Sequence, residues 1–261
     1  MIRIPYLFLL IMGSWTTCLS STGSNPETSP YPFNLGERLE YEIKWGFFPV
    51  GSAVMEVLAE DKAIENSPIL VRFNVRTNSF ADTFYKVRTS ITSTVSSDFS
   101  RTLKYQKEQR EGKTRREIEV VYNYDEGTVS YVKNGSKPKL TQISGYVHDP
   151  LSIAYLFRLH PLIPGGKTVL PTCDGKRFQE VVVQTKERKL ISLPRGRIFA
   201  IETIPALSNL RGVFNRSPQG ALKVWYSDDE RRVPLRVSSR VIVGSFTASL
   251  IKASPPIRGY H

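Results

Sequence analysis

The sequence predicts a mainly β protein with a single domain, built as one highly curved antiparallel sheet or incomplete β-barrel with one main helix at about residues 149–160. Apolar and polar residues alternate with a period of two through most of the chain, which places successive side chains on opposite faces of a strand. Turns rich in glycine, asparagine and proline separate these segments at short intervals. A single helical pattern accompanies about a dozen such strands, and so many strands in one domain favour a curved sheet or barrel.

The first strand is expected at residues 37–45, where every second residue is apolar and the others are charged. A turn at 47–49 leads to its partner strand, and residues 79–85 are expected to form a short helical turn or a loop. The dipeptide Asn134-Gly135 is a strong signal for a tight turn. The further strands of this half are expected at residues 51–58, 69–76, 87–95, 102–110, 115–124 and 129–133.

The main helix is expected because capping and apolar spacing agree. Asp149 is a good N-cap, and Pro150 suits the first helical position, where its missing N–H group costs nothing. The helix is expected to end before Pro161, which cannot continue it. The strands after it are expected at residues 167–170, 178–185, 188–192, 198–204, 222–227, 234–243 and 245–252.

The N-terminus predicts an exported protein. Arg3 is followed by an apolar run at 4–15 and then by small and polar residues, which is the pattern of a signal peptide. The run is short for a membrane span, which takes about 20 residues. A membrane anchor or a buried first helix is the alternative. The expected organisation is a signal peptide at 1–20, a flexible leader at 21–32, a single β-rich domain at 33–254 and a tail at 255–261.

The expected address is the bacterial cell envelope, with the protein secreted to the periplasm or associated with the outer membrane. Cleavage after Ser20 competes with lipidation of Cys18, but Trp15 and Thr17 stand where a lipobox has leucine and a small residue. No other segment is apolar enough to cross a bilayer, so we expect no transmembrane span in the mature chain. Without Cys18, Cys173 has no partner for an internal disulfide.

The charge balance is basic, with 36 Lys+Arg against 24 Asp+Glu and a formal net charge of +12. A basic exported protein meets anionic partners such as lipids, glycolipids and acidic glycans, and envelope proteins are further candidate partners. Nucleic acid is not expected as a partner, because the expected location is the cell envelope and no nucleic-acid-binding motif is present. The alternative is that scattered lysines and arginines only solvate the outward faces of strands.

The sequence shows no pattern that supports catalysis or cofactor binding. Its three histidines, His148, His160 and His261, lack the spacing of a metal site. No Gly-x-Ser-x-Gly elbow is present. The pair Asp228-Asp229 suits a hairpin turn better than the facing carboxylates of a glycosidase. We therefore expect no catalytic residue, no metal, no cofactor and no enzymatic activity.

Aromatic residues in turns and loops are the candidates for a ligand site. Rings at the turn 47–49 and within 79–85 are hard to assign to a core, and apolar loops beside a curved sheet can line a ligand cavity. They can equally be lids over the hydrophobic core. The candidate wall residues are Trp45, Phe47, Phe48, Phe80, Phe84 and Trp225.

The hairpin expected between residues 102 and 124 is the candidate for a surface contact, because basic side chains concentrate around its turn. Electrostatic contacts made there would weaken at high salt. The candidate residues are Lys107, Arg110, Lys113, Arg115 and Arg116.

Three motifs, in order, resemble the DUF3108 family. They are Gly36-Glu37 continuing to Val50-Gly51, Asp149-Pro150-Leu151-Ser152 continuing to Arg158, and the segment 222–229 continuing to 232–235. The resemblance covers about residues 33–250. It implies an exported bacterial protein of unknown function with no established catalytic residues. It also implies an architecture similar to envelope proteins whose half-open barrel holds acyl chains, although fold alone does not fix function.

Two main interpretations follow. The first is a non-enzymatic envelope protein that binds a hydrophobic or amphiphilic anionic molecule, a lipid or a glycolipid, in the curved sheet. The second is a structural or assembly protein that acts through surface contacts with envelope proteins or glycans. A hydrolase is the third interpretation, because the lack of a motif is weak grounds for rejecting one.

Overall fold

The computed structural model describes residues 31–61, 63–64, 66–206, 222–240, 244–258 and 260. These residues all belong to one compact unit, Tyr31–His261. The expected signal peptide, Cys18 and most of the expected leader lie outside the described residues. Within the described ranges no helix is long and apolar enough to cross a membrane.

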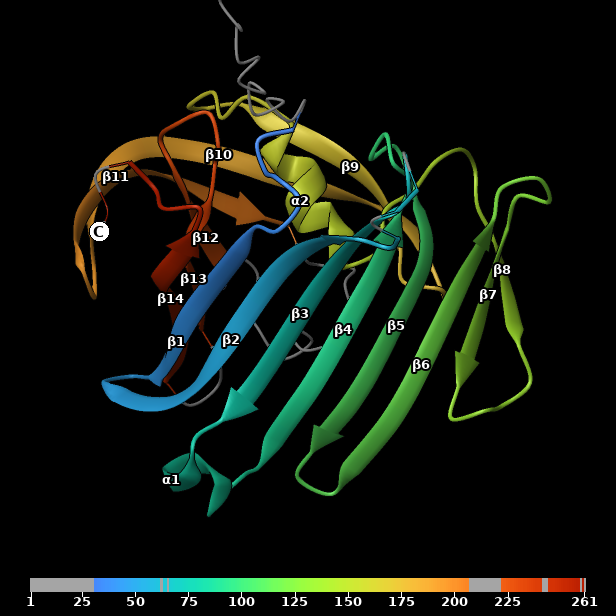
Figure 1. Ribbon diagram of the computed structural model, residues 1–261, viewed down its shortest axis with the longest axis horizontal. Helices are drawn as coiled ribbons and strands as arrows, with labels where there is room; N and C mark the ends of the chain where they lie inside the picture. The colour runs from blue at the N-terminus through green and yellow to red at the C-terminus, as the bar shows by residue number, and fades with distance from the viewer. Residues whose placement is uncertain are drawn as a thin grey trace, which may run out of the picture. The chain divides into compact units, whose positions relative to one another are not determined.

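The described strands form a single antiparallel sheet of 14 strands, in the order β8-β7-β6-β5-β4-β3-β2-β1-β14-β13-β12-β11-β10-β9 (Figure 1). Strands that follow one another in sequence are neighbours in the sheet from β1 to β8 and from β9 to β14. At the centre of the sheet β1 pairs with β14. The bounds are β1 Arg38–Trp45, β2 Phe48–Ala59, β3 Ile69–Thr77, β4 Val87–Val95, β5 Thr102–Glu111, β6 Thr114–Asn123, β7 Thr128–Lys133, β8 Lys139–Gln142, β9 Lys167–Cys173, β10 Phe178–Leu193, β11 Gly196–Pro205, β12 Leu222–Ser227, β13 Pro234–Arg240 and β14 Ser245–Ser254.

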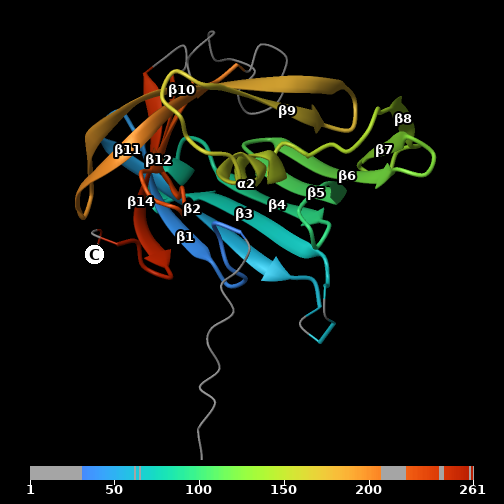
Figure 2. The same cartoon turned by 90° about the horizontal axis from the view of Figure 1, so that it is seen from above.

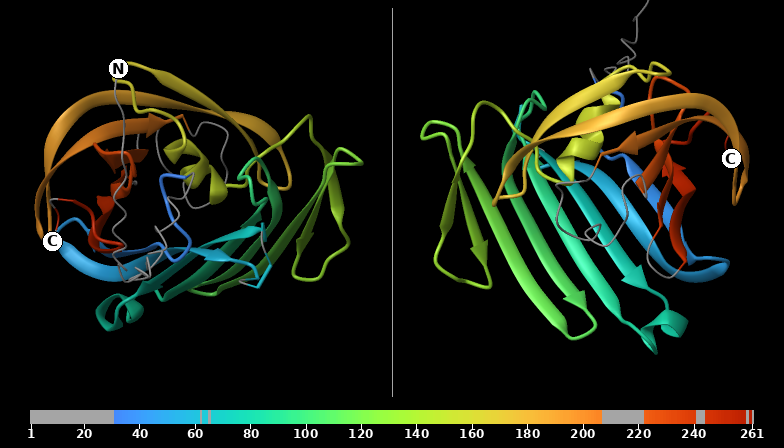
Figure 3. Two further views of the ribbon diagram at one scale, coloured as in Figure 1. Left: turned by 45° about the horizontal axis from the view of Figure 1, so that its top comes forward. Right: turned by 180° about the vertical axis from the view of Figure 1, so that it is seen from behind.

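The sheet curves so strongly that β9 and β10 pass over the face of β3–β6 (Figures 2 and 3). Register shifts in several ladders, such as the one between Thr185 and Arg188, help a long strand to bend. The two ends of the sheet meet through side chains, and the Tyr122 hydroxyl donates a 2.7 Å hydrogen bond to the carbonyl of Cys173. No ladder joins the described edge strands β8 and β9, so the sheet is not closed. The predicted fold class is confirmed.

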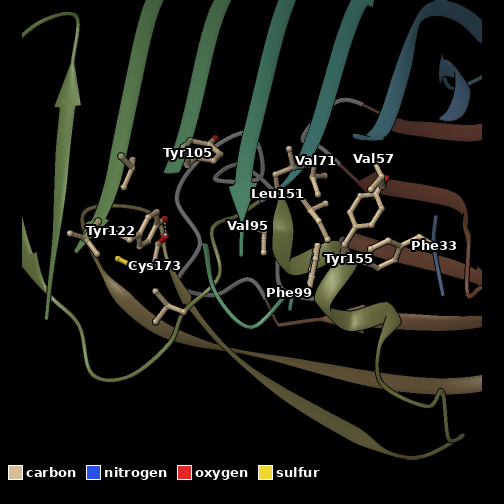
Figure 4. Packing of buried hydrophobic residues seen from close by; sticks show 14 of the residues in the cluster. Phe33, Val57, Val71, Val95, Phe99, Tyr105, Tyr122, Leu151, Tyr155 and Cys173 are labelled. Atoms are coloured by element: carbon tan, nitrogen blue, oxygen red, sulfur yellow. Dashed lines mark hydrogen bonds between the residues drawn. The ribbon is translucent and has the colours of Figure 1, made fainter. Parts of the chain in front are cut away.

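The helix α2, Ser152–Arg158, lies inside the curve of the sheet (Figure 2). Tyr155 is buried in the largest core cluster, with its ring edge-on to Phe33 at 5.1 Å between centroids. Figure 4 shows these two rings next to each other, with Tyr122 and Cys173 at the other end of the cluster. Phe157 instead enters a second cluster with Tyr226. The helix therefore fills the space between the two halves of the sheet. We call the face of the sheet that packs on α2 the inner face.

The structure corrects the predicted bounds of the main helix from about 149–160 to Ser152–Arg158. Asp149 does cap the turn that precedes it, because its carboxylate accepts hydrogen bonds from the backbone N–H groups of Leu151 and Ser152. Residues 149–151 form this turn and are not part of the helix. The short helix α1, Ser79–Asp82, lies where a helical turn or loop was expected.

Two strand predictions were also wrong in detail. The strands expected at 178–185 and 188–192 are one strand, β10, which continues through an irregularity at 185–188. The strand β8, Lys139–Gln142, was not expected at all. It has no buried residue, so it lacks the apolar alternation that reveals a strand in a sequence.

Candidate ligand-binding surface

Strand register places two lysines and a run of apolar residues in one line across the inner face. The core residue Tyr105 faces inward on β5, so Lys107 two positions later does too. Lys107 lies opposite Ile91 on β4 and opposite Ile118 on β6. The cross-strand line reads Lys133, Ile118, Lys107, Ile91, Phe73 and Met55, from β7 to β2; we call it the lysine row.

Every member of the lysine row is half-buried, whereas the next line toward α2 contains the core residues Val120, Tyr105 and Val71. The elements α2 and β10 cover the core end of the inner face, and the other ends of β3–β6 run beyond them (Figure 3, right). The lysine row thus lies directly beyond the part of the core that packs on α2. Its apolar members pack against the core around α2, and Met55 and Phe73 also pack against a further core cluster that contains Ala53.

Lys107 is an unusual residue in this position. Within the described ranges its ammonium group has no hydrogen bond and no ion pair, although the side chain is half-buried between Ile91 and Ile118. Burial lowers the pKa of Lys107, and the neighbouring Arg116 lowers it further, while Glu111 opposes both effects. A cation held in this way gains energy from any anion that approaches it.

A second line lies next to the lysine row, farther from α2. It reads Arg116, Gln109, Thr89, Val75 and Ala53, from β6 to β2. Gln109 and Thr89 are buried, and the Thr89 hydroxyl donates a 2.9 Å hydrogen bond to Glu111. The cations of the two lines, Lys133, Lys107 and Arg116, therefore lie on β5–β7, and the apolar side chains other than Ile118 lie on β2–β4.

The predicted aromatic wall residues do not line this surface. Trp45, Phe47 and Phe48 belong to the β1–β2 turn and its flanks, and Phe80 and Phe84 belong to the β3–β4 connection. All five are exposed, Phe47 to 94%. Trp225 lies on β12 in one cross-strand line with Arg236, Ser249 and Glu42. Trp225 is half-buried there and packs against the core cluster that contains Tyr41 and Leu250.

The structure divides the predicted basic hairpin between two faces. Lys107 and Arg116 are on the inner face, as part of the two lines above. Arg110 and Arg115 lie opposite each other on the outer face, and Lys113 is exposed in the turn. The hairpin is therefore not one basic patch. The residues predicted from the sequence did not include Lys133, Ile91, Phe73 and Met55. The sequence holds one indication of this surface: Lys107 is a charged residue at an inward-facing position of β5.

A buried polar cluster anchors α2 to the sheet. The Asp149 carboxylate accepts hydrogen bonds from the hydroxyls of Ser93 on β4 and Thr102 on β5. The Ser152 hydroxyl lies 3.0 Å from Nδ1 of His148. These residue types also occur in hydrolases, but each side chain here is at most 1% exposed, so a substrate does not reach them in this conformation.

A buried ion pair connects α2 to two segments that are distant in sequence, one around Glu37 and one around Arg231. Arg158 on α2 donates to both carboxylate oxygens of Glu37, at 2.6 and 2.9 Å. The same guanidinium donates to the carbonyls of Arg231 and Pro32. Arg231 also donates to Glu37, at 3.2 Å. These bonds link α2 to the segment before β1 and to the segment between β12 and β13, so the cluster has a structural role.

The thiol and the metal-binding residue types give no further site. Cys173 is the last residue of β9, is fully buried, and has its thiol pKa raised to about 11 by that burial. A thiol of that pKa is a poor nucleophile near neutral pH. The described part of the chain contains no group of three His, Cys, Asp or Glu residues placed to hold a metal ion.

The fold and the surface together define a class: an open, barrel-like antiparallel sheet wrapped around a short helix, with an amphipathic inner face. The chain belongs to the DUF3108 family, whose model, described as a protein of unknown function, matches residues 40–251. The resemblance inferred from the three motifs is therefore confirmed. No curated protein matches the sequence.

The solved structures include one with a similar fold. It is the crystal structure of a β-barrel-like protein of the domain of unknown function DUF1849 from Brucella abortus. The TM-score is 0.56 at 11% sequence identity, and the match covers 84% of this chain and 97% of the other. At this identity the likeness concerns the fold alone.

Proposed function

We propose that this protein is an exported, non-enzymatic component of the bacterial cell envelope that binds an amphiphilic anionic molecule of the lipid or glycolipid class on its inner face. One observation carries the proposal: Lys107, whose half-buried side chain makes no hydrogen bond or ion pair within the described residues, lies at one end of the apolar line formed by Ile91, Phe73 and Met55. An anionic head would lie against Lys107, Arg116 and Lys133. Its acyl chain would lie along Ile91, Phe73 and Met55.

The energetics favour a ligand with both parts. A hydrogen bond to a charged group such as the Lys107 ammonium contributes about 1.5–3 kcal/mol. Burying about eight CH₂ groups contributes roughly 6 kcal/mol, before the cost of losing the ligand's free motion. Neither part alone gives tight binding, so the surface selects molecules that carry a charge and a chain together.

The direct test is calorimetry with two dodecyl probes below their solubility limits, anionic dodecanoate and uncharged dodecanol. We expect Lys107→Met to lower the affinity for dodecanoate about tenfold to hundredfold and to leave the affinity for dodecanol nearly unchanged, because only the charge is lost. Ile91→Ser should weaken the binding of both probes. Lys113→Met, the same substitution in the exposed β5–β6 turn, is the matched control and should change neither.

Native mass spectrometry of protein purified from its own envelope without detergent complements the binding test. A reproducible added mass that is lost on organic extraction would identify the natural ligand. If the protein carries no added mass and Lys107→Met and Ile91→Ser bind dodecanoate like the parent, the inner face is not the binding site. The function would then rest on surface contacts instead.

A further inference from the structure

One end of the sheet carries a cluster of exposed aromatic rings that the proposed inner-face site does not use. We call it the aromatic end and define it by Trp45, Phe47, Phe48, Phe80, Phe84 and Tyr85. In an antiparallel sheet whose strands follow one another, alternate turns lie at the same end. The β1–β2 turn, the β3–β4 connection with α1, and the β5–β6 turn share this end (Figure 1).

Contacts tie these three turns into one surface. Asn78, the N-cap of α1, donates a 2.7 Å hydrogen bond to the carbonyl of Pro49 next to the β1–β2 turn. Gly112 in the β5–β6 turn lies under the ring of Tyr85, so that a Cβ atom there would be 2.6 Å from Tyr85 Cε2. The Phe80 and Phe84 rings pack edge to face at 5.6 Å between centroids.

Four of the six rings of the aromatic end project into solvent, whereas Trp45 stacks on Phe246 and Tyr85 lies over Gly112. Phe47, Phe84 and Phe48 are 94%, 79% and 64% exposed. Single exposed apolar side chains are ordinary, but a contiguous group of large rings marks an interaction surface. The rings stand on the tips of turns and not on a flat face or in a groove, which suits insertion into a soft surface better than packing against a rigid one.

The net charge at this end is positive. Lys86, Arg110 and Lys113 are exposed in or beside the turns and make no ion pair within the described ranges. Of the acids nearby, Asp82 is paired with Arg88 at 2.6 Å, and Glu111, which accepts a hydrogen bond from the neutral Thr89 hydroxyl, is outnumbered by these cations. Arg240 adds a further exposed cation beside the β1–β2 turn, because its partner residue Ser245 accepts a hydrogen bond from Gly46.

We infer that the aromatic end docks this protein onto the surface of a bilayer that contains anionic lipids. The rings of Phe47, Phe48, Phe80 and Phe84 enter the boundary between headgroups and acyl chains, and the basic side chains meet the lipid phosphates. Aromatic tips with flanking lysines and arginines are the composition that the membrane interface favours. The surface is separate from the lysine row, so the inference goes beyond the proposed function and does not rest on it.

The magnitudes support reversible binding and not permanent anchoring. Each basic residue close to an anionic surface raises partition roughly fivefold, and this gain falls off within a Debye length. The rings add an apolar contribution that salt does not screen. Lys86 and Lys113 therefore control the dependence on lipid charge, and Phe47 and Phe84 control the binding that remains at high salt.

The test is co-sedimentation of the full chain with two kinds of vesicle, phosphatidylcholine alone and phosphatidylcholine mixed with phosphatidylglycerol. We expect the parent to partition into the mixed vesicles at least tenfold more strongly. Phe47→Ser combined with Phe84→Ser should lower that partition on the order of tenfold. Lys86→Glu combined with Lys113→Glu should remove the preference for phosphatidylglycerol. Leu140→Ser on β8, 68% exposed and outside the aromatic end, is the matched control and should bind like the parent.

Two results would overturn the inference. One is equal partition of the parent and the double phenylalanine variant when both have the same thermal stability. The other is a parent that binds neither kind of vesicle, in which case the aromatic end serves a protein partner. Dodecanoate binding by the phenylalanine variants separates this outcome from the proposed function, because the inner face is unchanged in them and should bind as before.

Discussion

Arg158 and Glu37 show how individual residues hold this sheet in its curve. Each lies in one of the sequence motifs of the family, Glu37 at the start of the first and Arg158 at the end of the second. Both side chains are almost fully buried, and the guanidinium bonds to both carboxylate oxygens. Buried ion pairs contribute little net stability when intact, but removing one partner leaves a charge without water and without a counterion.

Replacing Arg158 by methionine should therefore destabilise the protein strongly. We expect a loss of about 3–5 kcal/mol in the free energy of unfolding, measured by urea denaturation, because Glu37 stays buried with only the partly exposed Arg231 beside it. The control is Arg38→Met, which breaks an exposed pair with Glu56 and should cost at most about 1 kcal/mol. Equal losses in the two variants would contradict a structural role for the buried pair.

His148 makes the stability depend on pH. Its ring stacks on Phe99 and is 1% exposed, and burial lowers the pKa of the folded-state imidazole below its ordinary value. The Asp149 carboxylate and the backbone of Ser100 and Phe99 act in the opposite direction, but burial outweighs them. Because the unfolded state binds a proton near pH 6.5 and the folded state binds it only at lower pH, stability present above pH 6.5 is lost as the pH falls.

The expected slope is up to about 1.4 kcal/mol of unfolding free energy per pH unit below pH 6.5 from this one group. His148→Phe keeps an aromatic ring against Phe99 and removes the titration. Urea denaturation at pH 7.5, 6.5 and 5.5 should show a shallower decline for the variant than for the parent. Parallel declines would mean that His148 takes up its proton without unfolding.

At the scale of elements, the β9–β10 turn shows how tightly the two ends of the sheet meet. Gly175 has φ +86°, and a Cβ atom there would lie 2.9 Å from side-chain atoms of both Val120 and Tyr131. Its carbonyl accepts a 3.0 Å hydrogen bond from Thr141. The turn therefore needs glycine for two reasons, its backbone conformation and the space it leaves for β6 and β7.

Two matched glycine substitutions separate these reasons. Gly135→Ala, at φ +67° with nothing within 4 Å of its Cβ, should cost only the backbone strain of about 1 kcal/mol. Gly175→Ala should cost roughly 1–3 kcal/mol more, because β6 and β7 must move as well. Thermal denaturation followed by circular dichroism would measure both. Similar midpoints for the two variants would mean that the contact between the sheet ends is loose.

Local patterns predicted most of the elements. The strands expected at 87–95 and 222–227 match β4 and β12, because each has clear alternation and ends at turn residues. The strand β10 was divided in two because the charged residues at 186–188 resemble a turn, and only its partners β9 and β11 keep it continuous. The helix start was misplaced because a capping residue and the first helical residue need not be adjacent.

At the scale of the whole molecule, the candidate site was beyond what the sequence could show. The lysine row joins residues of β2 to β7, and only the register between strands brings Lys107 level with Ile91 and Ile118. A shift of one residue would move Lys107 to the outer face. The aromatic residues at the turns were visible in the sequence as exceptions to the core pattern, but whether they line a cavity or project from one end depends on the curvature.

The pairing of β1 with β14 has a consequence for the order of folding. These two strands lie at the centre of the sheet, and their pairing joins the half built from β1–β8 to the half built from β9–β14. Contacts between residues so distant in sequence form late, because closing a long loop costs conformational entropy before the contacts that offset this cost can form. A chain still emerging from a ribosome or a translocation pore would expose the unpaired edges of β1 and β13 until Ser245–Ser254 arrives. Such edges are the usual starting points of aggregation, so a chaperone would be needed most in that interval.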